Sequence, residues 1–132
     1  MSAEAQLAAI ADATAALARA GVPHWLYGGW SEDFHAGVVQ REHDHSDLVV
    51  WSHDVGDARA ALAESGFTGE GRGLERDGVA LDLCIVETDL AGSVLFADGG
   101  AEWPPGALGA EQRTLEGVTA RVVSAEAAAW RP

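Results

Sequence analysis

Apolar residues recur at helical spacing in two parts of the 132-residue chain. Residues 3–20 are rich in alanine and carry leucine and isoleucine on one face, and the pattern ends at Gly21 and Pro23. Residues 54–65 repeat the pattern after Asp54, a residue type that favours the N-cap position. We therefore predict one helix over each segment.

Short apolar runs between these segments have the length and composition of buried strands. Strands are predicted over residues 24–28, 46–52 and 79–87. The Asp77-Gly78 pair before the third run is a hairpin signal. Strand edges around a turn are expected over residues 67–78.

The remaining segments are shorter or less regular. Residues 30–37 predict one or two helical turns that end at Gly37, and residues 90–111 are expected to be irregular. Residues 112–124 predict a hairpin that turns near Gly117, followed by a helix capped by Ser124. This order of elements predicts an α/β or α+β fold with a small mixed sheet flanked by helices.

Composition narrows the class of protein. The length predicts a single domain over residues 1–132, and 48% of the residues are apolar, enough for a core. The net charge of −13 argues against partners such as nucleic acid or anionic membranes and suits a neutral or cationic small molecule. A single cysteine, Cys84, and the lack of a basic leader or a long apolar run predict a cytoplasmic protein.

A Gly28-Gly29 pair stands between a predicted strand and a predicted helical turn. Glycines at such a junction let backbone N–H groups approach an anion, and the helix start adds favourable partial charge. Taken alone, the pair is weak evidence, because most such pairs are plain turns.

Two acidic residues and a histidine are candidates for metal or acid–base chemistry. His45 and Asp47 are two residues apart at a strand start, which places both on one face. Asp82 lies within an apolar run, where a carboxylate needs a metal, a hydrogen bond or a counter-charge. If the two strands are neighbours, Asp47 and Asp82 converge on one cation; a structural hydrogen bond or an arginine partner for Asp82 is the open alternative.

Together these residues resemble the small antibiotic nucleotidyltransferases, such as the lincosamide and aminoglycoside enzymes, in the DNA polymerase beta-like superfamily. The family pattern is Gly-Gly-Trp, an Asp, a Gly, Arg-Glu-His, and then Asp-x-Asp before an apolar strand. The positions in register are Gly28, Gly29, Trp30, Asp33, Gly37, Arg41, Glu42, His43, Asp47 and, in the later strand, Asp82.

The resemblance implies a nucleotidyltransferase fold and transfer of a nucleoside monophosphate from a nucleoside triphosphate to a small-molecule hydroxyl. It implies that Asp47 and Asp82 hold Mg²⁺ or Mn²⁺, and that Gly28, Gly29, Trp30 and Arg41 bind the nucleotide. We expect the Asp47 and Asp82 side chains in one cleft, with the glycine pair at its rim. The alternative for Trp30 is a packing role, and the alternative for Arg41 is an ion pair with Asp33.

The chain departs from the family pattern at one position of the metal pair. His45 stands where the family has the first Asp of Asp-x-Asp. Imidazole is a poorer ligand than carboxylate for Mg²⁺ but a good one for Zn²⁺ or Mn²⁺. Asp44 is adjacent and would reach the site only through a local bulge.

Two further expectations concern size and histidine content. Many relatives add a C-terminal helical domain that this chain lacks, so, with five tryptophans in a short chain, we predict a homodimer that completes the pocket. A structural zinc site among the clustered histidines is a minor alternative, since no cysteine joins them.

Three functions remain open from the sequence. The first is metal-dependent nucleotidyl transfer, with His45 as a substitute ligand. The second is a different enzyme on the same fold, in which His45 and Asp47 or Asp82 act as acid and base. The third is a small-molecule-binding protein without catalysis.

Overall fold

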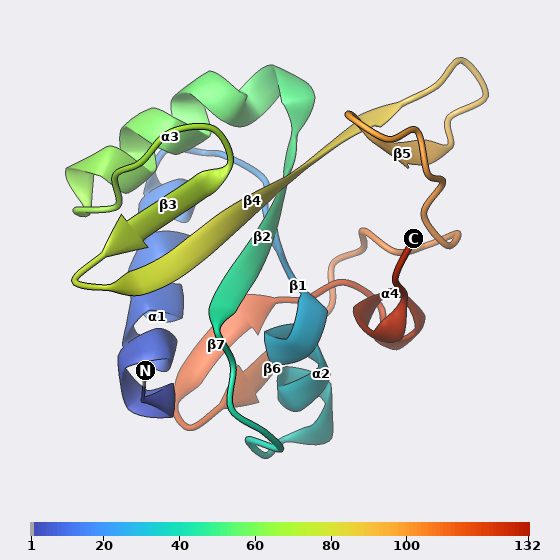
Figure 1. Ribbon diagram of the computed structural model, residues 1–132. Coiled ribbons are helices and arrows are strands. Elements are labelled where there is room, and N and C mark those ends of the chain that lie inside the picture. The colour runs from blue at the N-terminus through green and yellow to red at the C-terminus, as the bar shows by residue number, and fades with distance from the viewer. Residues whose placement is uncertain (1) are drawn as a thin grey trace.

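The computed structural model describes residues 2–132 and contains a mixed sheet covered by helices (Figure 1). The helices are α1 (Ala3–Arg19), α2 (Gly28–Ala36), α3 (Val55–Glu64) and α4 (Ala125–Ala129), with a short 3₁₀ turn, η1 (Ser52–Asp54). The strands are β1 (Trp25–Tyr27), β2 (His45–Trp51), β3 (Gly73–Arg76), β4 (Val79–Thr88), β5 (Val94–Phe96), β6 (Gln112–Leu115) and β7 (Val118–Arg121).

The sheet has the order β1-β2-β4-β3, and β5 extends it by pairing with the far end of β4. Strands β2 and β4 run parallel, whereas the β1, β3 and β5 pairings are antiparallel. Strands β6 and β7 form a separate hairpin. The predicted small mixed sheet flanked by helices is therefore confirmed.

The two faces of β2 and β4 differ because their side chains alternate. Leu48 and Val50 of β2 and Leu81 and Leu83 of β4 belong to the main core, which also contains the apolar faces of α1 and α3. Figure 1 places α1 and α3 together behind these strands. The opposite face of the strands is therefore left for other elements.

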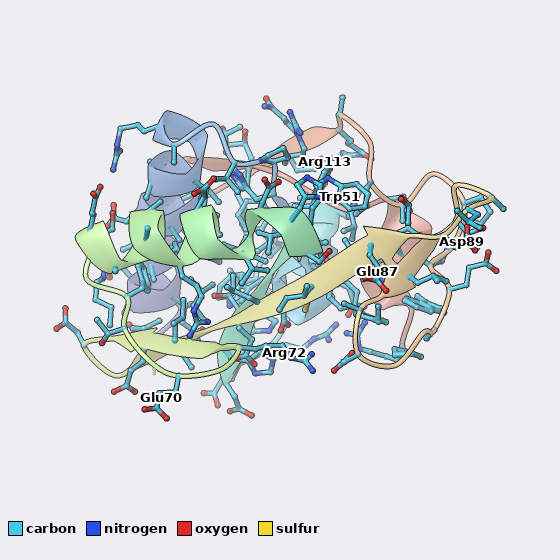
Figure 2. All side chains as sticks on the ribbon, turned by 90° about the horizontal axis from the view of Figure 1, so that it is seen from above. Trp51, Glu70, Arg72, Glu87, Asp89 and Arg113 are labelled. Atoms are coloured by element: carbon cyan, nitrogen blue, oxygen red, sulfur yellow. The ribbon has the colours of Figure 1, made fainter. Side chains whose placement is uncertain are left out.

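The far half of that opposite face is covered by an aromatic cluster. Residues 89–111 form an arm that contains β5 and returns over the sheet, so the prediction that residues 90–111 are irregular is wrong at this strand. Its Trp103 packs at 4.8 Å from Tyr27 and 5.1 Å from Trp130, measured between ring centroids. Figure 2 shows Glu87 along β4 and Asp89 at the tip of the arm, beyond the helices.

Both predicted N-cap residues, Ser124 and Asp54, stand at the start of their helices. The Ser124 hydroxyl accepts a hydrogen bond from the Ala127 N–H, as predicted for the last helix. Asp54 occupies the predicted N-cap position of α3, but its side chain makes no capping hydrogen bond within the described chain, and its backbone is helical because η1 leads straight into α3.

The tryptophans serve mainly as core residues. Trp25, Trp30 and Trp103 are all at most 5% exposed. Tryptophan abundance therefore no longer supports the predicted homodimer, which stays a prediction on other grounds. No helix in residues 2–132 combines the length and apolarity needed to cross a bilayer.

Candidate active site

The candidate site lies on the sheet face that points away from α1 and α3, toward the N-terminal ends of the paired strands β2 and β4. The register pairs Asp47 directly with Asp82, so the two side chains leave the sheet on the same face. His45 lies two residues before Asp47 on that face. One ligand atom from each of these three residues lies within 4.8 Å of the others, which confirms the expected convergence.

His45 faces both carboxylates. Its Nε2 is 3.3 Å from Asp47 Oδ2 and 3.9 Å from Asp82 Oδ2. The Asp47 side chain is 17% exposed, while those of His45 and Asp82 are 45% and 44% exposed. Asp47 is therefore half-buried, whereas His45 and Asp82 are accessible to a ligand that comes from solvent.

The Gly28-Gly29 pair lines one cleft with His45 and Asp47, as predicted, but Asp82, which was expected in the same cleft, is not among its lining residues. Gly28 has a φ of +73°, and a Cβ on it would lie 2.5 Å from Asp47 Oδ2. A Cβ on Gly29 would lie 2.8 Å from the His43 Nδ1 atom. The absence of side chains at both positions is thus what lets the start of α2 approach β2 and the segment before it this closely.

The first turn of α2 has free hydrogen-bonding capacity. Tyr27 occupies the N-cap position with an extended backbone, and its side chain makes no capping hydrogen bond in the structure of residues 2–132. The first N–H groups of a helix lack intrahelical acceptors and carry partial positive charge. The start of α2 can therefore receive an anion next to Asp47.

A buried pair supports the rim from below. His43 Nε2 contacts Asp33 Oδ2 at 2.6 Å, and the side chain of Asp33 is inaccessible to solvent. The Gln6 side chain donates a hydrogen bond to the His43 carbonyl. The alternative prediction that Arg41 pairs with Asp33 is therefore wrong, because His43 occupies that carboxylate.

The predicted role in binding nucleotide is excluded by the structure for Trp30 and remains open for Arg41. Trp30 is 1% exposed and stacks on His43 with ring centroids 4.3 Å apart, so it holds the rim from the core and cannot touch a bound nucleotide in this structure. Arg41 lies on the surface, with Nη1 3.6 Å from Glu32 Oε1. Of these two residues, Arg41 is therefore the one that can reach a ligand.

Arg131 is a site residue that sequence reasoning missed. It lines a cleft of about 360 Å³. The lining residues are Tyr27, Gly28, Gly29, Glu42, His43, Asp44, His45, Asp47 and Arg131. Arg131 donates hydrogen bonds to Glu32 Oε1 and to the Ala128 carbonyl, and its guanidinium lies 5.6 Å from the Tyr27 ring centroid. Its sequence neighbourhood carries no motif, so only the return of α4 against α2 reveals it.

Burial sets the acid–base character of the cleft. It raises the pKa of Asp47; His45 opposes this rise, and the nearby Asp82 carboxylate adds to it. Burial, followed by the Asp47 and Asp82 charges, raises the pKa of Cys84 to about 12, so this thiol stays protonated and serves as a weak hydrogen-bond donor to Asp47. His45 and Arg131, which act to lower the pKa of Asp47, therefore do not fully offset the effect of its burial.

The donor set fits a divalent cation. Two carboxylates and one imidazole nitrogen within reach of one another can neutralise a doubly charged ion and bind it directly. Asp44 lines the cleft but lies before the strand and outside this group. The other histidines are engaged elsewhere, as His43 is with Asp33, so the alternative zinc site among them is not formed in the described chain.

Comparison with known proteins gives one family and one fold. The sequence profile described as aminoglycoside-2''-adenylyltransferase matches residues 9–130. A search of curated proteins found no match.

Solved structures agree with the family match. A crystal structure of ANT(2'')-Ia with adenylyl-2''-tobramycin is 26% identical, with a TM-score of 0.74 over 94% of this chain and 72% of that one. A solution structure of the antibiotic-resistance factor ANT(2'')-Ia is 26% identical, with a TM-score of 0.75 over 94% of this chain and 68% of that one. The lincomycin-bound lincosamide adenylyltransferase LnuA, at 22% identity and 0.65 over 84% and 75%, shares the fold. The predicted nucleotidyltransferase fold is confirmed.

Proposed function

The chain belongs to the aminoglycoside-2''-adenylyltransferase family, and from that premise we propose that it adenylylates a hydroxyl of an aminoglycoside-like antibiotic. The observation that carries the proposal is the meeting of His45, Asp47 and Asp82 beside the uncapped start of α2. The net charge of −13 adds support, because an acidic surface attracts a polycationic acceptor.

The reaction forms one bond and breaks one. The acceptor hydroxyl oxygen attacks the α-phosphorus of the triphosphate, the bond from that phosphorus to the bridging oxygen breaks, and pyrophosphate leaves. The hydroxyl proton passes to a base. Such transfers depend mainly on positioning and on stabilising charge at the phosphate oxygens.

Asp47, Asp82 and His45 are the residues that would hold a divalent ion, Mg²⁺ or Mn²⁺. Such an ion supplies charge neutralisation for the phosphates of the nucleotide. Asp47 is suited to be the fixed ligand, since it is the least exposed of the three and is backed by Gly28. Asp82 is more accessible and is suited to accept the proton of the acceptor hydroxyl.

The phosphates are proposed to lie along the start of α2. The backbone N–H groups from Gly28 onward donate to them, and Arg131 and Arg41 reach them from the cleft rim. In the structure both arginines share Glu32, whose Oε1 is 3.1 Å from Arg131 Nη2 and 3.6 Å from Arg41 Nη1. Glu32 therefore keeps both guanidinium groups beside the cleft.

The second candidate function uses the same residues without a metal. The 3.3 Å contact between His45 Nε2 and Asp47 Oδ2 is the geometry of an imidazole oriented by a carboxylate, as acid–base chemistry needs. The two functions differ in their dependence on metal and triphosphate, and those requirements separate them experimentally.

A homodimer and a cytoplasmic location are parts of the same proposal. The accessible side chains of His45 and Asp82 leave room for a second copy of the chain to cover the site. Light scattering at micromolar concentration tests the dimer. The single cysteine is consistent with a reducing compartment, where nucleoside triphosphate is available.

The function is tested by incubating the protein with ATP, MgCl₂ or MnCl₂, and a panel of aminoglycosides and lincosamides. Mass spectrometry is expected to detect an acceptor that carries one added AMP, with release of an equal amount of pyrophosphate. Asp82→Asn is the matched negative control. Turnover of an acceptor without ATP would instead support the metal-free alternative.

A further inference from the structure

We propose that the cleft selects a first-row transition-metal ion such as Mn²⁺ over Mg²⁺, and that His45 is the residue that sets this selectivity. The inference rests on the proposed function, since the same three side chains hold the metal of the transfer reaction. The proposed function leaves the ion as Mg²⁺ or Mn²⁺; this inference assigns its chemical class and the residue that determines the preference.

The orientation of His45 distinguishes it from the other four histidines. His24 and His35 direct a ring nitrogen to the carbonyls of Val22 and Val123, both at 2.8 Å. His43 contacts Asp33, and His53 lies 3.6 Å from its neighbour Asp54. Within residues 2–132, His45 is the histidine whose ring nitrogen points between two carboxylates from different strands.

The register of the sheet fixes this arrangement. Asp47 and Asp82 are partners across the parallel β2–β4 pair, and His45 precedes Asp47 by one full strand repeat. Alternation therefore directs all three side chains to the same face, whatever their rotamers. An imidazole nitrogen and two carboxylate oxygens are presented together, and His45 is accessible enough to adjust to a bound ion.

The ligand types decide which ion is preferred. Mg²⁺ binds through oxygen atoms and is held largely by charge, so exchanging a third carboxylate for neutral imidazole weakens its binding. Mn²⁺, Co²⁺ and Zn²⁺ form stronger bonds to imidazole nitrogen, so the same exchange weakens them less or strengthens them. Two carboxylates still balance the charge of the divalent ion.

Glu42 and Asp44 also line the cleft, but neither belongs to the group whose ligand atoms lie within 4.8 Å of one another. Cys84 lies with Sγ 3.9 Å from Asp47 Oδ1 and donates toward it, so it orients that carboxylate. Arg131 lines the same cleft on the Tyr27 side and is tied to Glu32. The selectivity therefore depends on the identity of residue 45.

The test is a metal titration of the wild-type protein without nucleotide. Dissociation constants for MnCl₂ and MgCl₂ are measured by calorimetry, and the electron paramagnetic resonance signal of free Mn²⁺ gives an independent reading. The wild-type protein is expected to bind Mn²⁺ at least about tenfold more tightly than Mg²⁺.

Two substitutions at position 45 give opposite expectations. His45→Asp supplies a third carboxylate and is expected to bring the two dissociation constants within about threefold of each other, mainly by tightening Mg²⁺. His45→Gln removes the ring nitrogen without adding charge and is expected to weaken Mn²⁺ about tenfold or more while leaving Mg²⁺ weak. Circular dichroism confirms that both variants are folded.

His53→Gln is the matched control, because it removes another exposed histidine that lies beside an aspartate. It is expected to leave both constants unchanged. The inference is overturned if the wild-type protein binds neither ion, if it binds both equally, or if His45→Asp leaves the Mn²⁺ to Mg²⁺ ratio unchanged.

Failure of this inference is distinguishable from failure of the proposed function. If the protein adenylylates an acceptor equally well with either ion and binds both equally, the selectivity is wrong and the function stands. If Mn²⁺ binds selectively but no acceptor is modified with either ion, the selectivity stands and the proposed transfer is wrong.

Discussion

The two faces of β2 and β4 carry opposite kinds of residue although they belong to the same backbone. On the face toward α1 and α3, Leu48, Val50 and Leu83 are at most 1% exposed and belong to one apolar core. On the other face, Asp47 pairs with Asp82 and lies beside His45. Every second residue thus builds the main core, and the residues between them build the site at one end of the other face and the aromatic cluster at its far end.

This difference shows how a short chain positions charged groups. The apolar face fixes the register of the parallel pair, because a slip by one residue would turn Leu48 outward and Asp47 inward. The paired carboxylates are held together by that register at a cost, since burial disfavours the charge of Asp47. Core substitutions should therefore affect stability first, and site substitutions should affect chemistry first.

The largest expected effect on stability comes from the core face. Leu48→Ala removes a fully buried side chain and is expected to lower the free energy of unfolding by about 2–5 kcal/mol. Urea denaturation measures the loss. A cost below about 1 kcal/mol would mean that the apolar face does not hold the strand pair together.

Asp82→Asn, on the open face, is expected to have the complementary effect. It keeps the shape of the side chain but removes the charge that binds metal and accepts a proton. We expect kcat for adenylyl transfer to fall about a hundredfold to a thousandfold. The free energy of unfolding should change by less than about 1 kcal/mol. Steady-state kinetics and urea denaturation on one preparation measure both, and a fully active variant would refute the role of Asp82.

The close approach of Gly28 to Asp47 can be tested with a matched pair of glycine substitutions. Gly28→Ala and Gly37→Ala both place a side chain at a positive φ, which costs about 1–2 kcal/mol. Only Gly28 would also bring its Cβ against Asp47 Oδ2; around Gly37 nothing in the described chain lies within 4 Å of a Cβ. We expect Gly28→Ala to cost about 1–3 kcal/mol more and to weaken metal binding.

Equal losses in the two glycine variants, with metal binding unchanged, would contradict the close approach of the α2 start to Asp47. Thermal unfolding and metal titration of each variant supply the comparison.

Arg131→Gln is expected to have a moderate effect confined to substrate binding. If Arg131 contacts the phosphates, KM for ATP rises about three- to tenfold while kcat changes less. Arg113→Gln is the control, since Arg113 is similarly exposed and pairs with Glu111 outside the cleft. Equal KM values for the two variants would remove Arg131 from the site.

The smallest expected effect is a gain in stability. Because burial raises the pKa of folded Asp47, its ionised form opposes folding at neutral pH when metal is removed by a chelator. Asp47→Asn should then unfold at the same or a slightly higher temperature than the wild-type protein. The difference should shrink as the pH falls through the folded-state pKa and Asp47 becomes protonated. A clear loss of stability would show that the charge of Asp47 stabilises the fold.

The sequence predicted the regular elements well where local signals were strong. The helices and the three main strands were predicted with bounds within about two residues, and the hairpin turning near Gly117 was predicted but ends at Arg121, earlier than expected. The alternation around Asp47 and the apolar run around Asp82 predicted their convergence, because a period of two fixes which face each side chain occupies.

Features that depend on distant contacts were not predictable. The arm over residues 89–111 contains β5 only because β4 is long enough to offer it an edge. The pairing of Asp33 with His43 depends on how the chain returns after Gly37. Arg131 reaches the cleft because α4 packs on α2, and nothing in the local sequence indicates that contact.

The central claim is that the open face binds a nucleoside triphosphate through a metal held by Asp47, Asp82 and His45. Its most direct test is calorimetric titration of the wild-type protein with a non-hydrolysable ATP analogue, with MnCl₂ and then with a chelator. The account predicts binding with the metal and loss of that binding with the chelator or in Asp47→Asn. Equally tight binding in all three conditions, or none in any, would contradict it.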